Sequence, residues 1–314
     1  MRIVVVGAGA LGGLVAGHLV EAGVDAVLLE SDEKRAAILN RDGLYILQEG
    51  EGERRIPVRV ITSVEGQQPV DLVFLAVKSY QTEAAMRAVL PLVKPETRVL
   101  SMQNGIGNAD TITRMVRPEQ VLCGIFYHSV QHVGPNRIRF RKGIKPIQIA
   151  PFLGNGNGEV QEICGIFNQA GLRTEIVDNL QQVIWSKILH NAAVNPVSAL
   201  TGMTCNQMLA DEEVQRLCRA LTLEIVAVMR ARGVAIEDEE DPYRPVIASQ
   251  RALGDNHPSM WQDLARGVPT EIDAINGAVV REAARLGLSA PVNWTLVRLV
   301  HAREQTPLPC KKES

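Results

Sequence analysis

The sequence contains little that would direct it to a membrane or to nucleic acid. Its 33 basic and 35 acidic side chains leave a net charge of −2, so there is no electrostatic reason to expect nucleic acid or an anionic membrane surface as a partner. No apolar run reaches the roughly 18 residues of a transmembrane helix. After Met1 and Arg2 the chain enters a short strand-like apolar run, with no charged region, long apolar core and cleavage site before it, so no signal peptide is expected. We therefore expect a small molecule as partner, no nucleic acid and no membrane.

Aromatic residues and paired cysteines are also scarce. Aromatic side chains make up 4% of the chain against 46% for all hydrophobic residues, which indicates a core built on aliphatic packing. The five cysteines are odd in number and lack any C-x-x-C spacing, which argues against a disulfide framework and a zinc site. The histidines show no metal-ligand spacing and no G-x-S-x-G motif is present, so we expect no metal and no serine nucleophile. A cytoplasmic location is expected.

A change of pattern along the 314 residues predicts two domains. As far as residue 178, buried-strand runs alternate with helical stretches, whereas long helices follow from residue 179. We predict an α/β fold in which an N-terminal Rossmann-type NAD(P)-binding domain, residues 1–178, precedes an all-helical C-terminal substrate domain, residues 179–314. The expected strands are 3–6, 26–30, 71–77, 97–102, 121–127, 136–140, 146–150 and 172–177, with an inserted hairpin of 44–47 and 56–61. The expected helices are 13–22, 32–40, 79–89, one ending near 170, 179–200, 211–232, 242–254, 270–286 and 290–303.

A glycine-rich turn lies between the first strand and the first helix. It consists of Gly7, Ala8, Gly9, Ala10, Leu11 and Gly12. The first glycine permits a tight bend, the second lets a pyrophosphate approach the backbone, and the third lets helix and strand pack closely. Because strand, helix and the acidic Glu30 supply the context that this motif requires, we predict dinucleotide binding rather than a purely structural turn.

Glu30, at the end of the second strand, bears on the choice of cofactor. An acidic side chain there accepts hydrogen bonds from the ribose 2′-hydroxyl and repels a 2′-phosphate, which favours NAD. Lys34 and Arg35 offer compensating charge, although two basic residues on an exposed helix are often only a solvated face. The sequence leaves the preference open.

Lys78 and Asn104 each follow a predicted strand. Ligands bind at the carboxyl ends of strands in a doubly wound sheet, so both are candidates for cofactor or substrate contact. The alternative is a structural role, in which each side chain only caps the loop that carries it.

In the helical half, Lys187, Asn191 and Asn195 are spaced i, i+4 and i+8. On a helix they fall within roughly 80° of one face over about 12 Å, in an otherwise apolar segment. Such a stripe either binds a small polar substrate in a crevice or faces solvent. Pro196 within this helix would free a carbonyl near Ala192 and bend the axis.

Glu271 lies between Thr270 and Asp273, which together are typical of a helix start. An acidic residue in a first helical turn is favourable against the helix dipole, and this role would explain Glu271 by itself. The functional alternative pairs Glu271 with Lys187.

These motifs together resemble the ketopantoate reductases, or 2-dehydropantoate 2-reductases. The resemblance runs from Met1 to about Arg303, with the motifs in family order. They are the glycine turn, Val77-Lys78-Ser79-Tyr80-Gln81, Gln103-Asn104-Gly105, Lys187-x3-Asn191-x3-Asn195, Ser259-Met260-x-Gln262-Asp263 and Thr270-Glu271-Ile272-Asp273-x-Ile275-Asn276-Gly277.

The resemblance implies NADPH-dependent reduction of the small 2-oxo acid 2-dehydropantoate to pantoate, a step of pantothenate biosynthesis. Lys187 matches the proton donor and Glu271 the acidic residue of the site. The matched substrate-binding positions are Asn104, Lys187, Asn191, Asn195 and Ser259. The matched cofactor contacts outside the glycine turn are Lys78, Asn104 and Glu271. A homodimer is left open.

Two departures from the family pattern leave alternatives. Ser31, preceded by Glu30, stands where many members have an arginine for the 2′-phosphate, so NADH is an alternative to NADPH. Asn206 is offset by one residue from a further family asparagine, so its contact with substrate is open. An NAD-dependent dehydrogenase of another branched 2-hydroxy acid is the second hypothesis. A non-catalytic nucleotide sensor would not need Lys187, the asparagines and Glu271 together.

Overall fold

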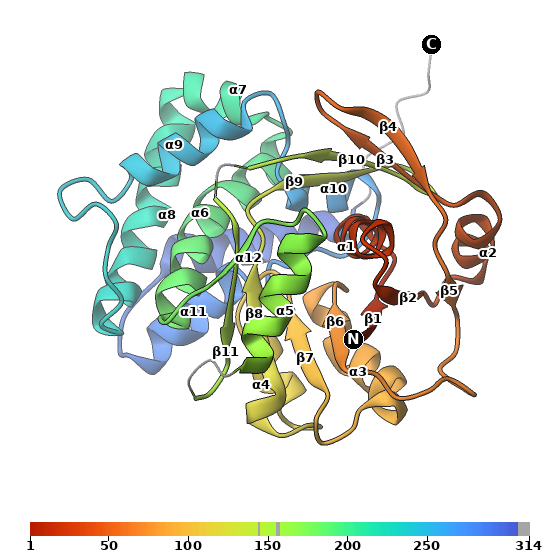
Figure 1. Cartoon of the computed structure of the whole chain (residues 1–314). Coiled ribbons are helices and arrows are strands. Elements are labelled where there is room, and N and C mark those ends of the chain that lie inside the picture. The colour runs from red at the N-terminus through yellow and green to blue at the C-terminus, as the bar shows by residue number, and fades with distance from the viewer. Residues whose placement is uncertain (144, 155–157, 307–314) are drawn as a thin grey trace, which may run out of the picture. The chain divides into compact units, whose positions relative to one another are not determined.

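A mostly parallel sheet organises the first half of the chain in the computed structural model, which describes residues 1–143, 145–154 and 158–306. Its strands are β1 (Arg2–Val6), β2 (Asp25–Leu29), β5 (Val60–Ile61), β6 (Leu72–Leu75), β7 (Arg98–Ser101), β8 (Val121–Ile125), β11 (Ile147–Pro151) and β12 (Thr174–Ile176). They lie in the order β12-β11-β8-β7-β6-β1-β2-β5, with only β8 and β11 antiparallel (Figure 1). The run β5-β2-β1-β6-β7-β8 has the Rossmann order, so the predicted fold class is confirmed.

Helices cover both faces of this sheet. They are α1 (Ala10–Glu21), α2 (Glu33–Asp42), α3 (Thr82–Val89), α4 (Asn108–Ile112) and α5 (Gly158–Gln169). In β1, Ile3 and Val5 enter a core shared with α1, α2 and α5, whereas Val4 and Val6 enter a core shared with α3 and α4. This alternation is the period of two that a strand buried on both faces requires.

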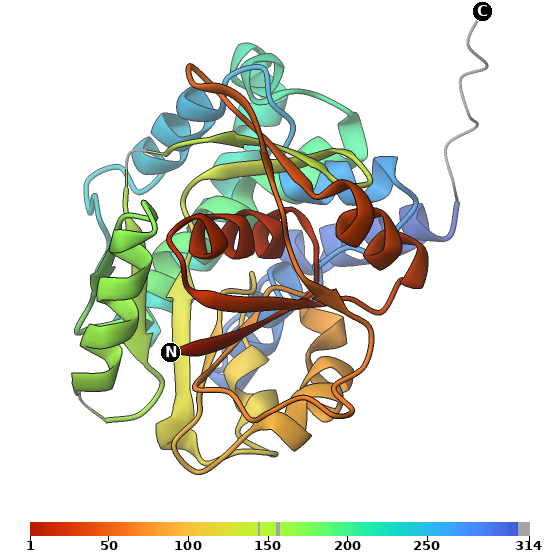
Figure 2. The same cartoon turned by 45° about the vertical axis from the view of Figure 1, so that its right-hand side comes forward.

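A second, four-stranded sheet packs on α1, as Figure 1 and Figure 2 show. Its order is β4 (Gly52–Ile56), β3 (Leu44–Gln48), β10 (Arg137–Arg141) and β9 (Ser129–Gly134). The close approach depends on Gly17 of α1, because a Cβ there would stand 2.9 Å from the Ile46 Cδ1 atom. The sequence placed the second hairpin strand at 56–61, which is wrong: Leu44 pairs with Ile56, and β5 lies in the larger sheet.

From residue 180 the described chain forms helices. They are α6 (Leu180–Thr201), α7 (Cys205–Ala210), α8 (Glu212–Ala231), α9 (Arg244–Leu253), α10 (Ser259–Ala265), α11 (Asn276–Arg285) and α12 (Pro291–Glu304). α6 is apolar nearly all round and buries residues on most sides, as expected of a central helix. Among the described residues, no helix combines the length and hydropathy that crossing a membrane would need.

The helix predicted over 270–286 begins only at Asn276, so the expectation that Glu271 lies in a first helical turn is wrong. Residues 271–275 form turns instead. The Ala274 carbonyl accepts the Ile106 N–H at 2.8 Å, and the Thr270 hydroxyl accepts the Ile272 N–H. These contacts override the helix-start pattern that the sequence shows.

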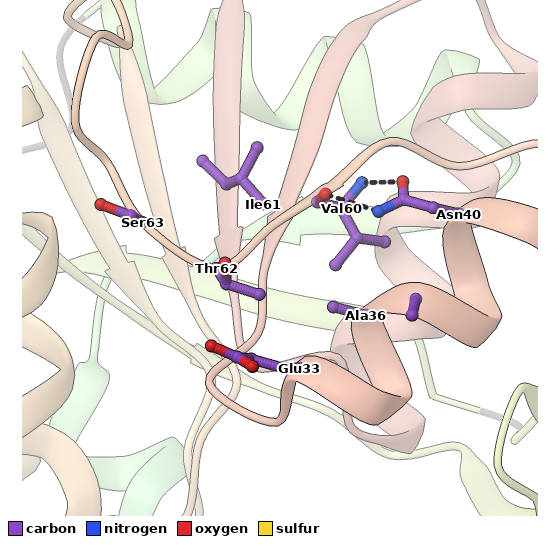
Figure 3. A pocket seen from close by; sticks show the side chains of 8 residues that line it. Glu33, Ala36, Asn40, Val60, Ile61, Thr62 and Ser63 are labelled. Carbon is purple, nitrogen blue, oxygen red and sulfur yellow. Dashed lines mark hydrogen bonds between the residues drawn. The ribbon is translucent and has the colours of Figure 1, made fainter.

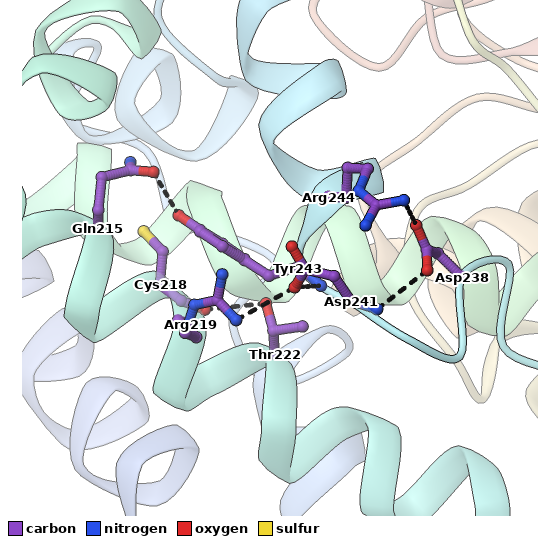
Figure 4. A network of polar contacts seen from close by, with 8 residues as sticks. All are labelled: Gln215, Cys218, Arg219, Thr222, Asp238, Asp241, Tyr243 and Arg244. Atoms are coloured by element: carbon purple, nitrogen blue, oxygen red, sulfur yellow. Dashed lines mark hydrogen bonds and ion pairs between the residues drawn. The ribbon is translucent and has the colours of Figure 1, made fainter.

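Polar contacts around Tyr243 join α8 to the segment that precedes α9 (Figure 4). The Tyr243 hydroxyl donates to the Gln215 side-chain oxygen at 2.8 Å, and the Arg219 guanidinium lies 5.0 Å from the ring centroid. Arg219 also pairs with Asp241 at 3.1 Å. Burial raises the pKa of the neighbouring Cys218 thiol to about 12, so this thiol stays protonated and unreactive. The cluster is structural.

Contacts divide the chain into two units. The first contains Met1–Gln103 and Gly107–Leu180, and the second contains Asn104–Ile106 and the chain from Gln181 onward. Residues 104–106 join the second unit through the Ile106 to Ala274 hydrogen bond. Each unit is described by itself below.

Candidate active site

The glycine turn has the geometry that a dinucleotide-binding loop requires. Gly7 has a φ of +95°, and a Cβ at Gly12 would overlap the Gly7 carbonyl oxygen. A Cβ at Gly9 would find only the His132 Nε2 atom at 4.0 Å, so space remains above the backbone there. No side chain caps the N-terminus of α1, whose first N–H groups are suited to an anion. The loop therefore fits a pyrophosphate.

Glu30 is tied to this loop. One carboxylate oxygen accepts the Ala8 N–H at 3.2 Å, and the other accepts the Asp32 N–H at 2.9 Å. The side chain is buried, and the Arg35 guanidinium approaches it to 3.7 Å. The first unit therefore holds a fixed acid directly beside the glycine turn.

No structural or functional role was predicted for Gln103 from the sequence. Its amide donates to the Val77 carbonyl at 3.0 Å and to the Thr82 hydroxyl at 2.8 Å, while its oxygen accepts from Ser101. It thus holds the loop that carries Lys78 at the carboxyl end of β6. Its place in the Gln-Asn-Gly motif was the available signal.

A surface hollow lies between α2 and β5, as Figure 3 shows. Asn40 holds the edge strand β5 there. Its side-chain amide donates to the Val60 carbonyl at 2.8 Å, and its side-chain oxygen accepts the Val60 N–H at 2.9 Å. The eight lining residues include one acid, Glu33, and no base. The hollow adds no positive charge to this edge of the sheet.

In the second unit, α6 carries the predicted polar stripe. Lys187 and Asn191 are half-buried, and Asn195 is only 6% exposed. Their neighbours Ile188 and Ala192 are buried. This burial is inconsistent with a stripe that simply faces solvent, so α6 presents an ammonium and two amides in largely apolar surroundings.

Asn104 and Glu271, 167 residues apart in sequence, are brought together. The Asn104 amide donates to the Glu271 carboxylate at 3.3 Å, and Glu271 is 5% exposed. Gly105 permits this approach because its φ is +90° and a Cβ would stand 2.5 Å from the Ala274 Cβ. The pairing of Glu271 with Lys187 stays a prediction.

Two further candidates lie elsewhere in the second unit. Ser259 is the half-buried first residue of α10. Asn206 is exposed, and its amide donates to Asp255 at 2.9 Å, so its side chain already has a surface partner. Among the described residues no group of three or more His, Cys, Asp or Glu side chains is arranged to hold a metal ion.

The Rossmann strand order, the glycine turn at α1 and the helical second unit define a class, the nicotinamide-dinucleotide-dependent oxidoreductases. Two family models match the chain: "Ketopantoate reductase PanE/ApbA" over residues 3–154 and "Ketopantoate reductase PanE/ApbA C terminal" over residues 179–304. The chain belongs to the ketopantoate reductase family and is a 2-dehydropantoate 2-reductase-like oxidoreductase.

Individual relatives match over nearly the whole chain. A 2-dehydropantoate 2-reductase of Pyrococcus horikoshii is 34% identical over 311 residues, covering 97% of this chain and 98% of the relative. The crystal structure of a ketopantoate reductase from Ralstonia eutropha JMP134 has a TM-score of 0.88 at 30% identity, covering 98% and 99%. D-mandelate dehydrogenase with NADH and anilino(oxo)acetate has the same fold, with a TM-score of 0.89 at 24% identity over 98% and 99%.

Proposed function

We propose that this protein reduces 2-dehydropantoate to pantoate in pantothenate biosynthesis. Residues 1–178 would serve as the cofactor domain and residues 179–314 as the substrate domain. The observation that carries the proposal is the Lys-Asn-Asn stripe on α6, half-buried at Lys187 and Asn191 and buried at Asn195, which would offer a proton donor and two amides to a small keto acid. The names of the full-length relatives support it.

When bound, a reduced nicotinamide dinucleotide would supply the hydride for the ketone carbon. Negative charge then builds on the ketone oxygen, where the Lys187 ammonium stabilises it and donates a proton to complete the alcohol. Asn191, Asn195 and Ser259 would hold the polar groups of the substrate. Glu271, held by Asn104, would orient Lys187 and contact the cofactor.

The test is turnover by the purified protein. NADPH or NADH should be oxidised when 2-dehydropantoate is added, and no oxidation with either would overturn the substrate assignment. Lys187→Ala should lower kcat by about 10²- to 10⁴-fold and leave the dinucleotide Kd unchanged, because it removes the acid alone. Ser186→Ala, next to it on α6 but outside the stripe, is the matched control. Unchanged turnover in Lys187→Ala would remove this residue from the mechanism.

A second candidate is an NAD-dependent dehydrogenase of another branched 2-hydroxy acid. D-mandelate dehydrogenase with NADH has the same fold, so this architecture accepts a different 2-hydroxy acid. A panel of 2-oxo acids discriminates between the two. A kcat/KM that is highest for 2-dehydropantoate supports the first proposal, whereas a higher value for another acid supports the second.

We propose that NADH is used at least as well as the NADPH that is typical of the family. The fixed carboxylate of Glu30 suits a ribose 2′-hydroxyl and repels a 2′-phosphate, and Ser31 offers no positive charge. Glu30→Gln combined with Ser31→Arg should move the ratio of kcat/KM values toward NADPH. A wild-type kcat/KM that is reproducibly higher with NADPH than with NADH would contradict the proposal.

A cytoplasmic location is also proposed, because Cys123, Cys164, Cys205 and Cys218 are free thiols. A homodimer is a further proposal, and analytical ultracentrifugation tests it.

A further inference from the structure

Pro196 leaves a buried carbonyl on α6 without its helical donor. Proline has no N–H, so the carbonyl of Ala192, four residues earlier, cannot make its hydrogen bond within the helix. Ala192 is fully buried, and an unpaired carbonyl there would cost about 1–3 kcal/mol. The freed carbonyl belongs to the turn of α6 that runs from Asn191 to Asn195.

Asn276 supplies the missing donor. Its side-chain amide lies 2.9 Å from the Ala192 carbonyl oxygen and 2.9 Å from the Asn293 side-chain oxygen, so it donates to both. Asn276 and Asn293 have no exposed surface. A buried amide with two acceptors fixes the distance between α6, α11 and α12 at this point.

The line of contacts ends on a carboxylate of α8. The Asn293 amide donates to Glu224 at 2.8 Å, and the same carboxylate accepts the N–H groups of Val292 and Asn293 at 2.8 and 2.9 Å. Because these N–H groups lie at the start of α12, Glu224 caps that helix. Three helices, α8, α11 and α12, are thus joined to α6 at Ala192.

We propose that Asn276 is a positioning residue for catalysis: by holding the Ala192 carbonyl at the proline, it sets the positions of Asn191, Asn195 and, one turn earlier, Lys187. This inference rests on the proposed function, since it takes the stripe to be the keto-acid site. Asn276 is part of the Ile-Asn-Gly motif in the sequence, to which the catalytic scheme gives no role.

A double-mutant cycle tests the inference. Asn276→Leu removes the donor at similar volume and should lower kcat/KM for the keto acid by about 10- to 100-fold, because small displacements of reacting groups are costly. The dinucleotide Kd should not change, since the glycine turn lies in the first unit. Pro196→Ala restores an N–H at position 196, so the double variant should recover most of the loss.

Val279→Ala is the matched control for lost packing, because Val279 is fully buried one turn further along α11. It should lower the free energy of unfolding but leave the keto-acid kcat/KM within about twofold of wild type, at temperatures where the protein is fully folded. An equal kinetic loss in Val279→Ala would overturn the inference. Unchanged kinetics in Asn276→Leu, or no recovery in the double variant, would also overturn it.

Amide hydrogen exchange over residues 187–195 separates this inference from the proposed function. Exchange should be faster in Asn276→Leu than in wild type and should slow again in the double variant. Wild-type protein that reduces no 2-oxo acid would overturn the proposed function, and the exchange data would still decide whether Asn276 holds α6. Identical exchange in all variants would overturn the contact itself.

Discussion

Gly105 and Gly107 share a backbone conformation but differ in their surroundings. Their φ angles are +90° and +102°, a region that L side chains rarely adopt. A Cβ at Gly105 would stand 2.6 Å from the Ala274 carbonyl oxygen, whereas a Cβ at Gly107 would meet nothing within 4 Å. Comparing substitutions at the two positions therefore separates the cost of backbone strain from the cost of a steric clash.

We predict that Gly105→Ala is more destabilising than Gly107→Ala. The second variant should cost about 1–2 kcal/mol from backbone strain alone, and the first at least about 1 kcal/mol more, because Ala274 must move. Urea unfolding measures both. Gly105→Ala should also raise the KM for the keto acid, since Asn104 would shift from Glu271. Equal unfolding costs would contradict the structure at Ala274.

The glycine turn gives a second contrast. Gly12→Ala should prevent stable folding, because its Cβ would overlap the backbone oxygen of Gly7. Gly9→Ala should leave the free energy of unfolding within about 1 kcal/mol of wild type, yet weaken dinucleotide binding at least tenfold, because the Cβ enters the space that a pyrophosphate needs. Fluorescence titration with NADH measures the second effect. Wild-type affinity in Gly9→Ala would place the pyrophosphate elsewhere.

At the scale of elements, Arg232 links three helices of the second unit. It follows α8, donates to Glu282 of α11, and donates to Gln181 of α6 at 3.0 Å. Its guanidinium also lies 5.3 Å from the ring centroid of Trp185. Glu282 also accepts two hydrogen bonds from the guanidinium of Arg285. One carboxylate of α11 therefore organises the contacts among these helices.

This carboxylate should make stability depend on pH. The hydrogen bond from Arg285, and next that from Arg232, lower the pKa of Glu282 to about 2. Since the folded pKa lies below the unfolded one, the stabilisation is complete above about pH 5 and is lost as the pH falls toward about 2. Glu282→Gln should therefore flatten the dependence of the urea midpoint on pH in this range.

The control for this prediction is Glu83→Gln, which removes an exposed carboxylate paired with Arg87 on α3. Such exposed pairs contribute little, so its curve should follow that of wild type. A Glu282→Gln curve that also follows wild type would show that Glu282 gains nothing from its arginines in the folded state.

The long periodic elements could be predicted from sequence, and the pairings between distant segments could not. The first strand, glycine turn and helix, and the helices α6, α8 and α12, follow from local patterns and are confirmed. β9 was missed, and β4 was misplaced because Gly-Glu-Arg-Arg-Ile is too polar to resemble a strand. Both strands exist through pairing: Tyr45 of β3 pairs with Arg55 of β4, and Phe140 of β10 pairs with Val130 of β9.

In the candidate site, too, the local motifs could be predicted from sequence and the contacts between distant residues could not. Residue types and spacing pointed to the glycine turn and to the stripe on α6. The contacts of Asn104 with Glu271 and of Asn276 with Ala192 join residues 167 and 84 positions apart, and no local pattern encodes them. Asn276 was visible only as part of a motif, without a role.

The whole molecule has separate hydrophobic cores in its two units. The first unit contains two core clusters on the faces of its sheet, and the second contains one among its helices. All three tryptophans, Trp185, Trp261 and Trp294, belong to the second unit, whereas the glycine turn belongs to the first. Tryptophan fluorescence therefore reports on the unit that lacks the glycine turn.

We predict that a dinucleotide stabilises the two units unequally. NADH at about 100 times its Kd adds about 2.7 kcal/mol to the folded state that binds it. The urea transition seen by far-UV circular dichroism, which reports both units, should move further than the transition seen by tryptophan fluorescence. Coincident transitions with equal shifts would show instead that the chain unfolds as one cooperative body.

The assignment of residues 104–106 to the second unit has a consequence for biosynthesis. A ribosome makes these residues long before Ala274, whose carbonyl receives the Ile106 N–H. Domains generally fold as the chain emerges, N-terminal part first. The Ile106 N–H and the Asn104 amide therefore meet Ala274 and Glu271 only after more than half of the chain has been added. Completion of the Asn104 and Glu271 pair is a late event, so a nascent chain that stops before residue 271 never assembles it.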